Sequence, residues 1–414
     1  VVSTLIAAST GIIGATIVML GLISLPAMTR AGLPLGLSSG LVCASGTLGQ
    51  IIPPSIVLIL LGDQISNGYL EAQHGAGNFA PEPVSVADLF AGALLPGLLL
   101  VALYGLYVAV RARLAPVRAA TEAIAEPAAE VRAETVTPRL LLTVFLPPLA
   151  LILSVLGSIL AGVATPTEAA AVGAGGALLL AGAAQPNAAL ARPLALLTLV
   201  AVAVILAANA ALPQGTRGGT GTVRVVGLAG TTVIALGLLA NAILLARRGV
   251  LGAVLRETVA VSSMVFGIII GASMLSLVFR GFGGDELIEA LLLGLPGDEL
   301  GTLVVVMGVV FLLGFILEFV EIIFIVVPIV GPVLLAGSLD PVWIAVLLAL
   351  NLQTSFLTPP FGFALFYFRA VAPASLSTLA LYRAVLPFVS LQLVALCLVA
   401  RFPALATWLP GVLR

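Results

Sequence analysis

The ten residues Gly46–Ser55 read GTLGQIIPPS and lie inside an apolar run from Leu33 to Leu61. Two glycines and two adjacent prolines disfavour a helix there, and a residue that precedes a proline also avoids helical geometry. A helix over Leu35–Ala44 would rise about 15 Å, which is half of a hydrocarbon core about 30 Å thick. The stretch therefore predicts a helix that breaks near the membrane midplane, where free backbone groups are tolerated only in a cavity or against a ligand.

A counterpart occurs late in the chain. The stretch Asn351–Phe361 reads NLQTSFLTPPF and interrupts another apolar run. Aligning Pro53-Pro54 with Pro359-Pro360 places Thr47 opposite Gln353. Two interrupted apolar segments at corresponding places in two halves indicate the binding site of a secondary transporter. A pair of kinked spans without a ligand is the alternative.

The composition defines the class of protein. Hydrophobic residues make up 61% of the chain and charged residues 8%, and the mean hydropathy is +1.25. A soluble domain carries about 25% charged residues, so this is a polytopic membrane protein. No basic stripe for nucleic acid is present, and no G-x-x-x-x-G-K-[ST] loop supports ATP-driven pumping. The lone His74 and the scattered acids form no familiar metal-ligand spacing.

The chain begins without a methionine, and we expect it to lack its natural N-terminus.

Two segments have the pattern of re-entrant hairpins. Val1–Met28 is either one imperfect span or a hairpin that turns around Ser9–Gly14. In Thr302–Leu335, a straight span would place Glu318 and Glu321 inside the membrane, at a cost of about 2.5–3.5 kcal/mol each. A hairpin whose tip reaches a wet cavity near Gly314–Glu321 avoids that cost, and the alternative is a contact within a helix pair.

The remaining pattern gives a topology. All 17 basic residues are arginines. If neither hairpin makes a net crossing of the membrane, 12 arginines lie on one face and 5 on the other. The face with 12 arginines is then predicted to be cytoplasmic. The two broken spans then run in opposite directions, which predicts inverted repeats. The expected parts are a first half over 1–112, a cytoplasmic linker over 113–138 and a second half over 139–402. The first half contains an exposed loop over 62–87. The second half contains inserted spans near 194–246, an interfacial segment over 282–300, a hairpin over 302–335, a broken helix over 341–369 and a last span over 382–402.

Four stretches, in order, carry a resemblance to a known family. They are Gly11-x-x-Gly14-Ala15-Thr16, Ser45–Ser55, the run Ala164-Thr165-Pro166-Thr167-Glu168-Ala169-Ala170, and Asn351–Phe366. The chain resembles the large membrane subunit of tripartite ATP-independent periplasmic (TRAP) transporters over nearly its whole length, except for the insertion near 194–245.

The resemblance implies an all-α elevator fold in the bacterial inner membrane, with sodium as the coupling ion and no other cofactor. It also implies import of an organic acid, a periplasmic substrate-binding protein and a small membrane subunit, separate or fused. Carried onto this chain, the sodium candidates are Thr10, Gly11, Gly46, Thr47, Gly49, Pro53, Gly314, Glu318, Asn351 and Ser355. The candidate substrate contacts are Thr16, Ser55, Thr165, Gln353, Thr354, Thr358 and Pro359, and Thr358 is also a candidate for sodium.

One departure concerns the first hairpin tip. Many members of the family have Gly-Ser-Ser there, whereas this chain has Gly11-Ile12-Ile13. A first sodium site would therefore depend on backbone carbonyls and on Thr10 or Thr16.

Three other functions are compatible with parts of the pattern. The chain could be a stand-alone sodium/carboxylate symporter of related fold, or a passive structural or channel subunit. A membrane-embedded hydrolase could use Glu318 and Glu321, which lie at positions i and i+3 of one helix, but no nucleophile-and-base set accompanies them. An enzyme is therefore not expected.

Overall fold

The computed structural model describes residues 12–114, 138–185, 193–198, 200–202 and 221–413. These residues form helices and turns, with no strand among them. Within this part, five helices are long and apolar enough to cross a membrane, and a bent pair raises the number to six. The predicted class, an all-α polytopic membrane protein, is confirmed.

The chain forms two compact units. The first is drawn from Val1–Arg132, Leu160–Val163 and Val265–Arg414, and the second from Ala133–Ile159 and Ala164–Met264. Both predicted broken spans belong to the first unit, whereas Thr165 belongs to the second.

In the second unit, the described segments are α6 (Pro138–Leu160), α7 (Pro166–Ala183), a short helix Pro193–Val202, α9 (Gly221–Arg247) and the beginning of α10 (Val250–Gly281). Helix α7 packs against α9. Thr165 caps α7, because its hydroxyl oxygen accepts from the N–H of Glu168 at 3.3 Å while its own N–H donates to the Glu168 carboxylate at 2.8 Å. The predicted linker lies almost wholly outside the described residues, and so does part of the predicted insertion.

The first broken span is present. Helix α2 (Ile13–Arg30) precedes α3 (Leu35–Thr47), a 3₁₀ turn η1 (Leu48–Gln50), α4 (Ile56–Gly75) and α5 (Val86–Leu114). The expected exposed loop over 62–87 is wrong for most of its length. Helix α4 continues to Gly75, because Ile65, Gly68 and Ala72 are buried on it and α4 packs against α14. Its few acidic residues do not interrupt the helix, because tertiary packing supplies the stability.

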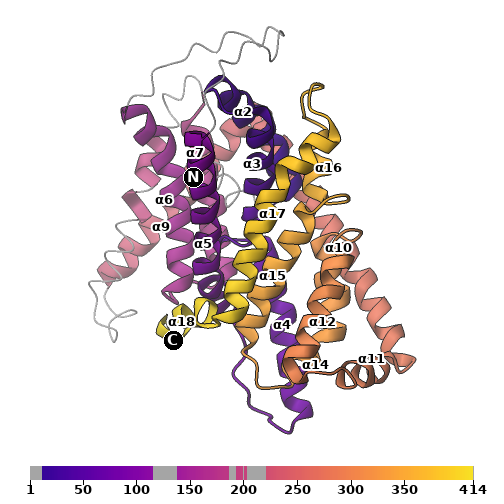
Figure 1. Ribbon diagram of the computed structural model, residues 1–414. Helices are drawn as coiled ribbons and strands as arrows, with labels where there is room; N and C mark the ends of the chain where they lie inside the picture. The colour runs from indigo at the N-terminus through magenta and orange to yellow at the C-terminus, as the bar shows by residue number, and fades with distance from the viewer. Residues whose placement is uncertain (1–11, 115–137, 186–192, 199, 203–220, 414) are drawn as a thin grey trace. The chain divides into compact units, whose positions relative to one another are not determined.

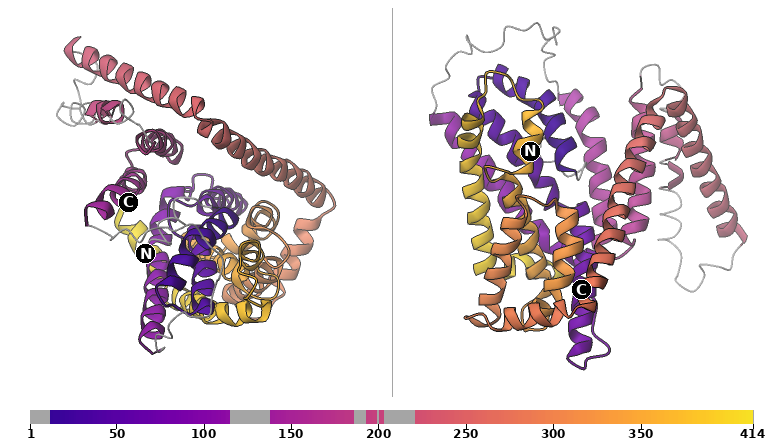
Figure 2. Two further views of the ribbon diagram at one scale, coloured as in Figure 1. Left: turned by 90° about the horizontal axis from the view of Figure 1, so that it is seen from above. Right: turned by 90° about the vertical axis from the view of Figure 1, so that its right-hand side faces the viewer.

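The second half follows a similar plan. After α10 come α11 (Gly284–Leu293), α12 (Asp298–Leu313), α13 (Phe319–Glu321), a π-helical turn η2 (Ile322–Val326), α14 (Val327–Leu335), α15 (Pro341–Leu357), α16 (Phe363–Arg369), α17 (Thr378–Arg401) and α18 (Ala404–Leu413). The expected interfacial segment over 282–300 is two elements rather than one, because the chain bends by 120° between α11 and α12. Helix α11 consequently lies across the lower end of the first unit (Figures 1 and 2).

The segment between α12 and α14 folds back on itself. Glu299 in the first turn of α12 accepts hydrogen bonds from Ser338, which follows α14. The Ser338 N–H donates to both carboxylate oxygens at 3.0 Å, and the Ser338 hydroxyl donates to one of them at 2.9 Å. The two ends of the segment therefore meet, and its turn lies at Gly314–Glu318. The re-entrant hairpin over 302–335 stays a prediction, which this fold-back supports.

Helix α15 lies at the centre of the first unit. Every residue from Val342 to Leu357 is buried, and α15 packs against α3, α4, α5, α12, α16, α17 and α18. Its start is defined by sequence: Asp340 is the N-cap, and Pro341 occupies the first helical position. The Asp340 carboxylate accepts from the N–H groups of Val342 and Trp343 at 2.8 and 3.0 Å.

Replacing Asp340 by alanine should lower stability, because two N–H groups at the start of the central helix lose their acceptor. We expect a loss of about 1 kcal/mol, visible as a lower melting temperature of the purified protein in detergent. Asp340→Asn keeps a side-chain acceptor and serves as the control. Equal melting temperatures for Asp340→Ala and wild type would contradict this assignment.

The contacts between the halves are reciprocal. Helix α3 packs against α17 while α15 packs against α5, and α4 packs against α14 while α16 packs against α2. Likewise, α3 contacts α16 and α15 contacts α4. From α3 to α4 the chain descends in Figure 1, whereas from α15 to α16 it ascends. The two broken spans thus run in opposite directions, and each contacts the helices of the other half that correspond to its own neighbours.

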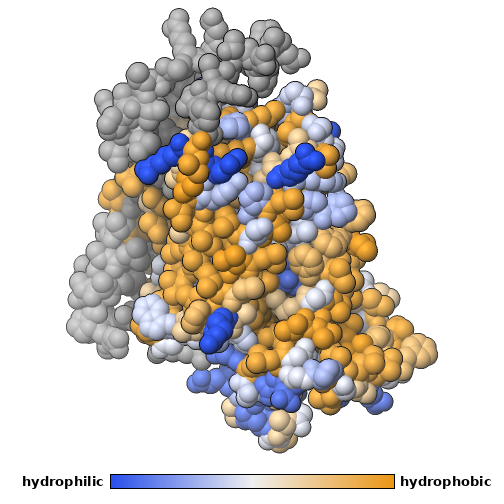
Figure 3. All heavy atoms as spheres, viewed as in Figure 1, coloured by the Kyte–Doolittle hydropathy of each residue, from blue (hydrophilic) through white to orange (hydrophobic). Residues whose placement is uncertain are grey.

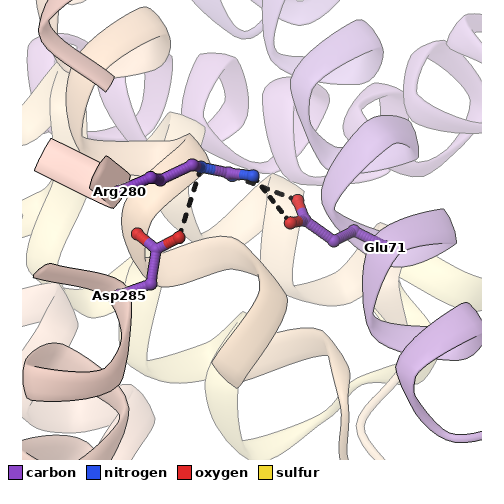
Figure 4. Close-up of polar contacts among 3 residues, drawn as sticks. All are labelled: Glu71, Arg280 and Asp285. Carbon is purple, nitrogen blue, oxygen red and sulfur yellow. Dashed lines mark hydrogen bonds and ion pairs between the residues drawn. The ribbon is translucent and has the colours of Figure 1, made fainter. Parts of the chain in front are cut away.

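Charged residues mark the ends of the first unit. On the face in Figure 3, apolar residues form a band over the middle of these helices, and hydrophilic residues gather above and below it. At the lower end, Arg280 on α10 donates to both carboxylate oxygens of Glu71 on α4, at 2.8 and 3.2 Å. It also pairs with Asp285 on α11 at 3.3 Å (Figure 4). This ion pair network links the ends of three helices outside the apolar band.

Candidate functional site

The first break consists of a 3₁₀ turn followed by a turn and bends over residues 51–54, and Ser55 is extended. Helix α3 ends at Thr47, and α4 begins after Ser55. The Ser55 hydroxyl donates to the Gln50 carbonyl at 2.6 Å and accepts from the N–H of Leu58 at 3.4 Å. Ser55 therefore caps α4 and fixes the turn. The Gln50 side chain is buried, and both of its amide atoms lack a partner among the described residues.

The second break is shorter than the sequence suggested. Helix α15 includes Asn351 and all residues to Leu357, so only residues 358–362 leave the helix. The break starts later because this polar run is buried between helices and keeps its backbone hydrogen bonds. The Tyr382 hydroxyl of α17 donates to the Pro360 carbonyl at 2.9 Å and holds the break against that helix. Both Pro–Pro peptide bonds, Pro53-Pro54 and Pro359-Pro360, are cis.

The hairpin tip packs directly on α15. Gly314 faces Ser355 so closely that a Cβ atom at Gly314 would lie 2.9 Å from the Ser355 Cβ. The Asn351 side-chain amide donates to the Met307 carbonyl of α12 at 2.7 Å. Beyond the tip, the N–H of Glu318 donates to the Glu321 carboxylate at 2.6 Å, and the two glutamates form a reciprocal cap. Each therefore has a structural role at the start of α13.

Helix α2 contacts an element beside each of the two breaks. The Tyr367 ring of α16 lies against Gly14, where a Cβ atom would be only 2.8 Å from ring carbon Cε1. The Glu318 carboxylate lies within electrostatic reach of the same tyrosine. Ile17 of α2 leaves no room for a side chain at Gly46. Turn η1 in turn contacts α4, α5 and α15. Both breaks, the hairpin tip and the start of α2 thus belong to one connected set of contacts.

Most sequence-predicted site residues lie on these contacting elements. They are Thr16, Gly46, Thr47, Gly49, Pro53 and Ser55 in the first half, and Gly314, Glu318, Asn351, Gln353, Thr354, Ser355, Thr358 and Pro359 in the second. Thr10 and Gly11 lie outside the described residues. Thr165 lies in the second unit, where its side chain and N–H are engaged with Glu168.

The hydroxyl groups of the site share one feature that the sequence did not reveal. Each donates its proton to the backbone carbonyl three or four residues earlier: Thr16 to Ile12, Thr47 to Ala44, Thr354 to Leu350, Ser355 to Leu352 and Thr358 to Thr354, at 2.7–2.9 Å. A hydroxyl oxygen keeps acceptor lone pairs after it has donated its proton. These groups are therefore suited to a cation, and they would have to break a hydrogen bond before donating to an anion.

Sequence reasoning missed several polar residues of this region. Tyr382 lies against the second break and Tyr367 against the start of α2, and Tyr104 and Gln392 are buried on α5 and α17. A polar residue inside an apolar span is costly and is often functional. That pattern was visible for Gln392 in the last span, whereas nothing local distinguished the tyrosines.

The chain matches the family model described as "Tripartite ATP-independent periplasmic transporter, DctM component" over residues 1–215 and 214–405. The chain belongs to this family. It is 26% identical to the C4-dicarboxylate TRAP transporter large permease protein DctM of Vibrio cholerae over 98% of this chain and 75% of that protein. It is 27% identical to the protein of the same name from Pseudomonas aeruginosa, with the same coverage. The Isethionate TRAP transporter permease protein DctMQ of Oleidesulfovibrio alaskensis is 25% identical over 96% of this chain and 49% of that protein.

Family membership decides between several of the expected functions. This TRAP permease is a transporter component of the bacterial inner membrane and not an enzyme. The hydrolase alternative for Glu318 and Glu321 is therefore discarded. Permeases of this family act in secondary transport of organic acids with a periplasmic binding protein and a small membrane subunit.

Proposed function

We propose that this TRAP permease imports an organic acid anion, handed over by a periplasmic binding protein, and that a sodium gradient drives the import through an elevator movement. The observation that carries the proposal is the convergence of both helix breaks on one set of contacts in the first unit. The expected contacts with a small membrane subunit and the lipid bilayer belong to the same proposal.

Sodium fits the chemistry of the breaks. Helices α3 and α15 both end at a break, and the last carbonyl groups of a helix carry a partial negative charge. Hydroxyl oxygens with acceptor lone pairs lie in the last turns of α3 and α15, at Thr47, Thr354 and Ser355, and in the second break at Thr358. The Thr47 oxygen already accepts from the Gln392 amide and keeps one lone pair. Carbonyl and hydroxyl oxygens at such helix ends coordinate sodium in transporters with broken helices. On the first side, the absence of hydroxyls at Ile12 and Ile13 leaves that role to backbone carbonyls and Thr47 or Thr16.

An acidic substrate fits the opposite helix ends. Helices α4 and α16 begin at the breaks, and the free N–H groups at the start of a helix attract anions. The names of relatives specify C4-dicarboxylate, isethionate and sialic acid as substrates, and all three compounds carry an acidic group. We therefore place the anion between the two breaks, near Ser55 and Thr358, with Gln353, Thr354 and Pro359 on the α15 side. Because the hydroxyls of Ser55, Thr354 and Thr358 already donate to backbone carbonyls, backbone N–H groups would donate to the anion.

An elevator movement is supported by the reciprocal contacts. If the halves are inverted repeats, each pairs a hairpin with a broken helix, and the contacts α4–α14 and α16–α2 tie the halves to each other. A body joined in this way would carry the site across the membrane as one piece. The hairpin tip, which packs on Ser355 and has Glu318 half-buried beyond it, would then control access to the site.

The proposal is tested by uptake into proteoliposomes that contain the permease and its small subunit. We expect a radiolabelled C4-dicarboxylate to enter only when the binding protein and an inward sodium gradient are both present. Uptake of free substrate without the binding protein would favour the stand-alone symporter. An uptake rate that does not depend on the sodium gradient would favour a passive structural or channel subunit.

Thr358→Val should weaken sodium activation, because it keeps the side-chain shape and removes one hydroxyl oxygen from the second break. We expect half-saturation to require about tenfold more sodium, equivalent to about 1.4 kcal/mol of binding free energy. Thr407→Val is the matched control, because the Thr407 hydroxyl on α18 also donates to the backbone carbonyl four residues earlier, that of Pro403. An unchanged sodium dependence in Thr358→Val would remove this residue from the site.

A further inference from the structure

A buried polar cluster connects the two halves beside the breaks. It consists of Thr47 on α3, Tyr104 on α5, Gln353 on α15 and Gln392 on α17, and these side chains are exposed by 3% or less. Four helices of the first unit each contribute one residue. We call this group the Tyr104 cluster. None of its members faces solvent, so their polar atoms depend on one another.

The cluster is only partly bonded in this conformation. The Gln392 amide donates to the Thr47 hydroxyl at 3.3 Å. The Tyr104 hydroxyl lies near the side chains of Gln353 and Gln392, but it forms no hydrogen bond with either of them in this conformation. As a result, the Tyr104 hydroxyl, both amide atoms of Gln353 and the carbonyl oxygen of Gln392 have no partner among the described residues. Unpartnered buried polar groups cost about 1–3 kcal/mol each. A small displacement that lets these neighbours bond would therefore be favourable.

The position of the cluster indicates what would cause that displacement. Thr47 is the last residue of α3, and Gln353 lies in the last two turns of α15. The C-terminal ends of these two helices are the places where the proposed sodium sites lie. Thr47 and Gln353 are also aligned when the two Pro–Pro pairs are superimposed in sequence. A chain of side chains thus runs from Thr47 through Gln392 and Tyr104 to Gln353, between equivalent points of the two halves.

We propose that Tyr104 and Gln392 are positioning residues that couple the two breaks. Sodium binding at one break shifts the end of its half-helix, which closes the hydrogen bonds of the Tyr104 cluster and orders the other break. This inference rests on the proposed sodium coupling. Coupling of this kind is reciprocal, so each sodium site raises the affinity of the other. It predicts cooperative sodium binding that depends on a hydroxyl group touching neither the ion nor the substrate.

Tyr104→Phe tests the inference because it removes only that hydroxyl. The ring packs edge-on against Phe388 at a centroid distance of 5.3 Å, and phenylalanine keeps this contact. Tyr107→Phe is the matched control. Tyr107 lies on the same helix and packs against the same ring at 5.2 Å, but it is half-exposed and is not part of the cluster.

The measurement is the melting temperature of the permease with its small subunit in detergent, titrated with sodium chloride against potassium chloride at constant ionic strength. A ligand that binds the folded state raises this temperature. In wild type and Tyr107→Phe we expect the same cooperative rise. In Tyr104→Phe we expect a melting temperature without sodium at or above that of wild type, because the variant removes an unpartnered buried hydroxyl. We also expect loss of cooperativity and roughly 2- to 30-fold more sodium at half-saturation.

The outcomes are distinguishable. A merely structural hydroxyl would lower the melting temperature of Tyr104→Phe equally with and without sodium, and that result overturns the inference. A sodium titration of Tyr104→Phe that matches wild type overturns it as well, while leaving the proposed function intact. If sodium does not raise the melting temperature of wild type at all, sodium coupling itself fails, and the inference fails with it.

Discussion

Gly314→Ala is expected to reduce uptake by one to two orders of magnitude. The added Cβ atom would overlap the Ser355 hydroxyl and lie 2.9 Å from its Cβ. Ser355 is fully buried on the central helix and has no room to retreat. Overpacking of this kind costs about 1–3 kcal/mol, and the hairpin tip is the less constrained partner. The tip would therefore move away from α15, and the oxygens of Ser355 and of the tip backbone would no longer converge.

The structure provides a control for this variant on the same hairpin. At Gly308 of α12, an added Cβ atom would meet nothing within 4 Å, and alanine is favoured over glycine in a helix. Gly308→Ala should therefore transport like wild type in the same proteoliposomes. A Gly314→Ala variant with wild-type uptake and sodium dependence would show that the tip does not need its contact with Ser355.

Gly40→Ala is expected to destabilise the whole first unit. Gly40 on α3 faces the backbone of α17 so closely that its Cβ would overlap the Ala384 carbonyl oxygen and lie 2.9 Å from the carbonyl carbon. It would also lie 3.0 Å from the Phe388 ring. A backbone carbonyl cannot rotate away as a side chain can, so the two helices must separate. We expect a loss of about 3 kcal/mol or more, at the upper end for overpacking, and a melting temperature lowered by several degrees.

Gly36 is the matched control, because it lies one turn earlier on α3. There an added Cβ would be 3.9 Å from the Ala384 Cβ, which is an ordinary contact. Gly36→Ala should be neutral or slightly stabilising, because alanine is the better helix former. If both variants melted like wild type, the close approach of α3 and α17 would be disproved. Of the reciprocal pair of contacts α3–α17 and α15–α5, only the second would then remain.

Local chemistry accounts for the features that the sequence predicted well. Proline cannot continue a helix and restricts the residue before it, so an interruption near each Pro–Pro pair could be predicted from the sequence, although α15 continues to Leu357. The cost of placing Glu318 and Glu321 in lipid predicted a turn near Gly314. These arguments need only neighbouring residues and the membrane.

Tertiary packing decided the rest. Helix α4 runs through the region expected to be a loop because α14 covers one side of it, and the sequence of α4 does not contain that information. The sequence placed Ser355 among the sodium candidates, Thr354 among the substrate contacts and Thr358 in both sets. Only the structure showed that all three hydroxyls donate their protons to backbone carbonyls three or four residues earlier.

By itself, the sequence determined the class of protein, the two breaks and the hairpin turn, because each follows from backbone restrictions and the cost of burying charge in lipid. Only the tertiary structure decided which distant residues meet: Gly314 with Ser355, Gly14 with Tyr367, and Gln392 with Thr47. Such contacts depend on how helices far apart in the chain fit against one another, and a single sequence does not show that fit.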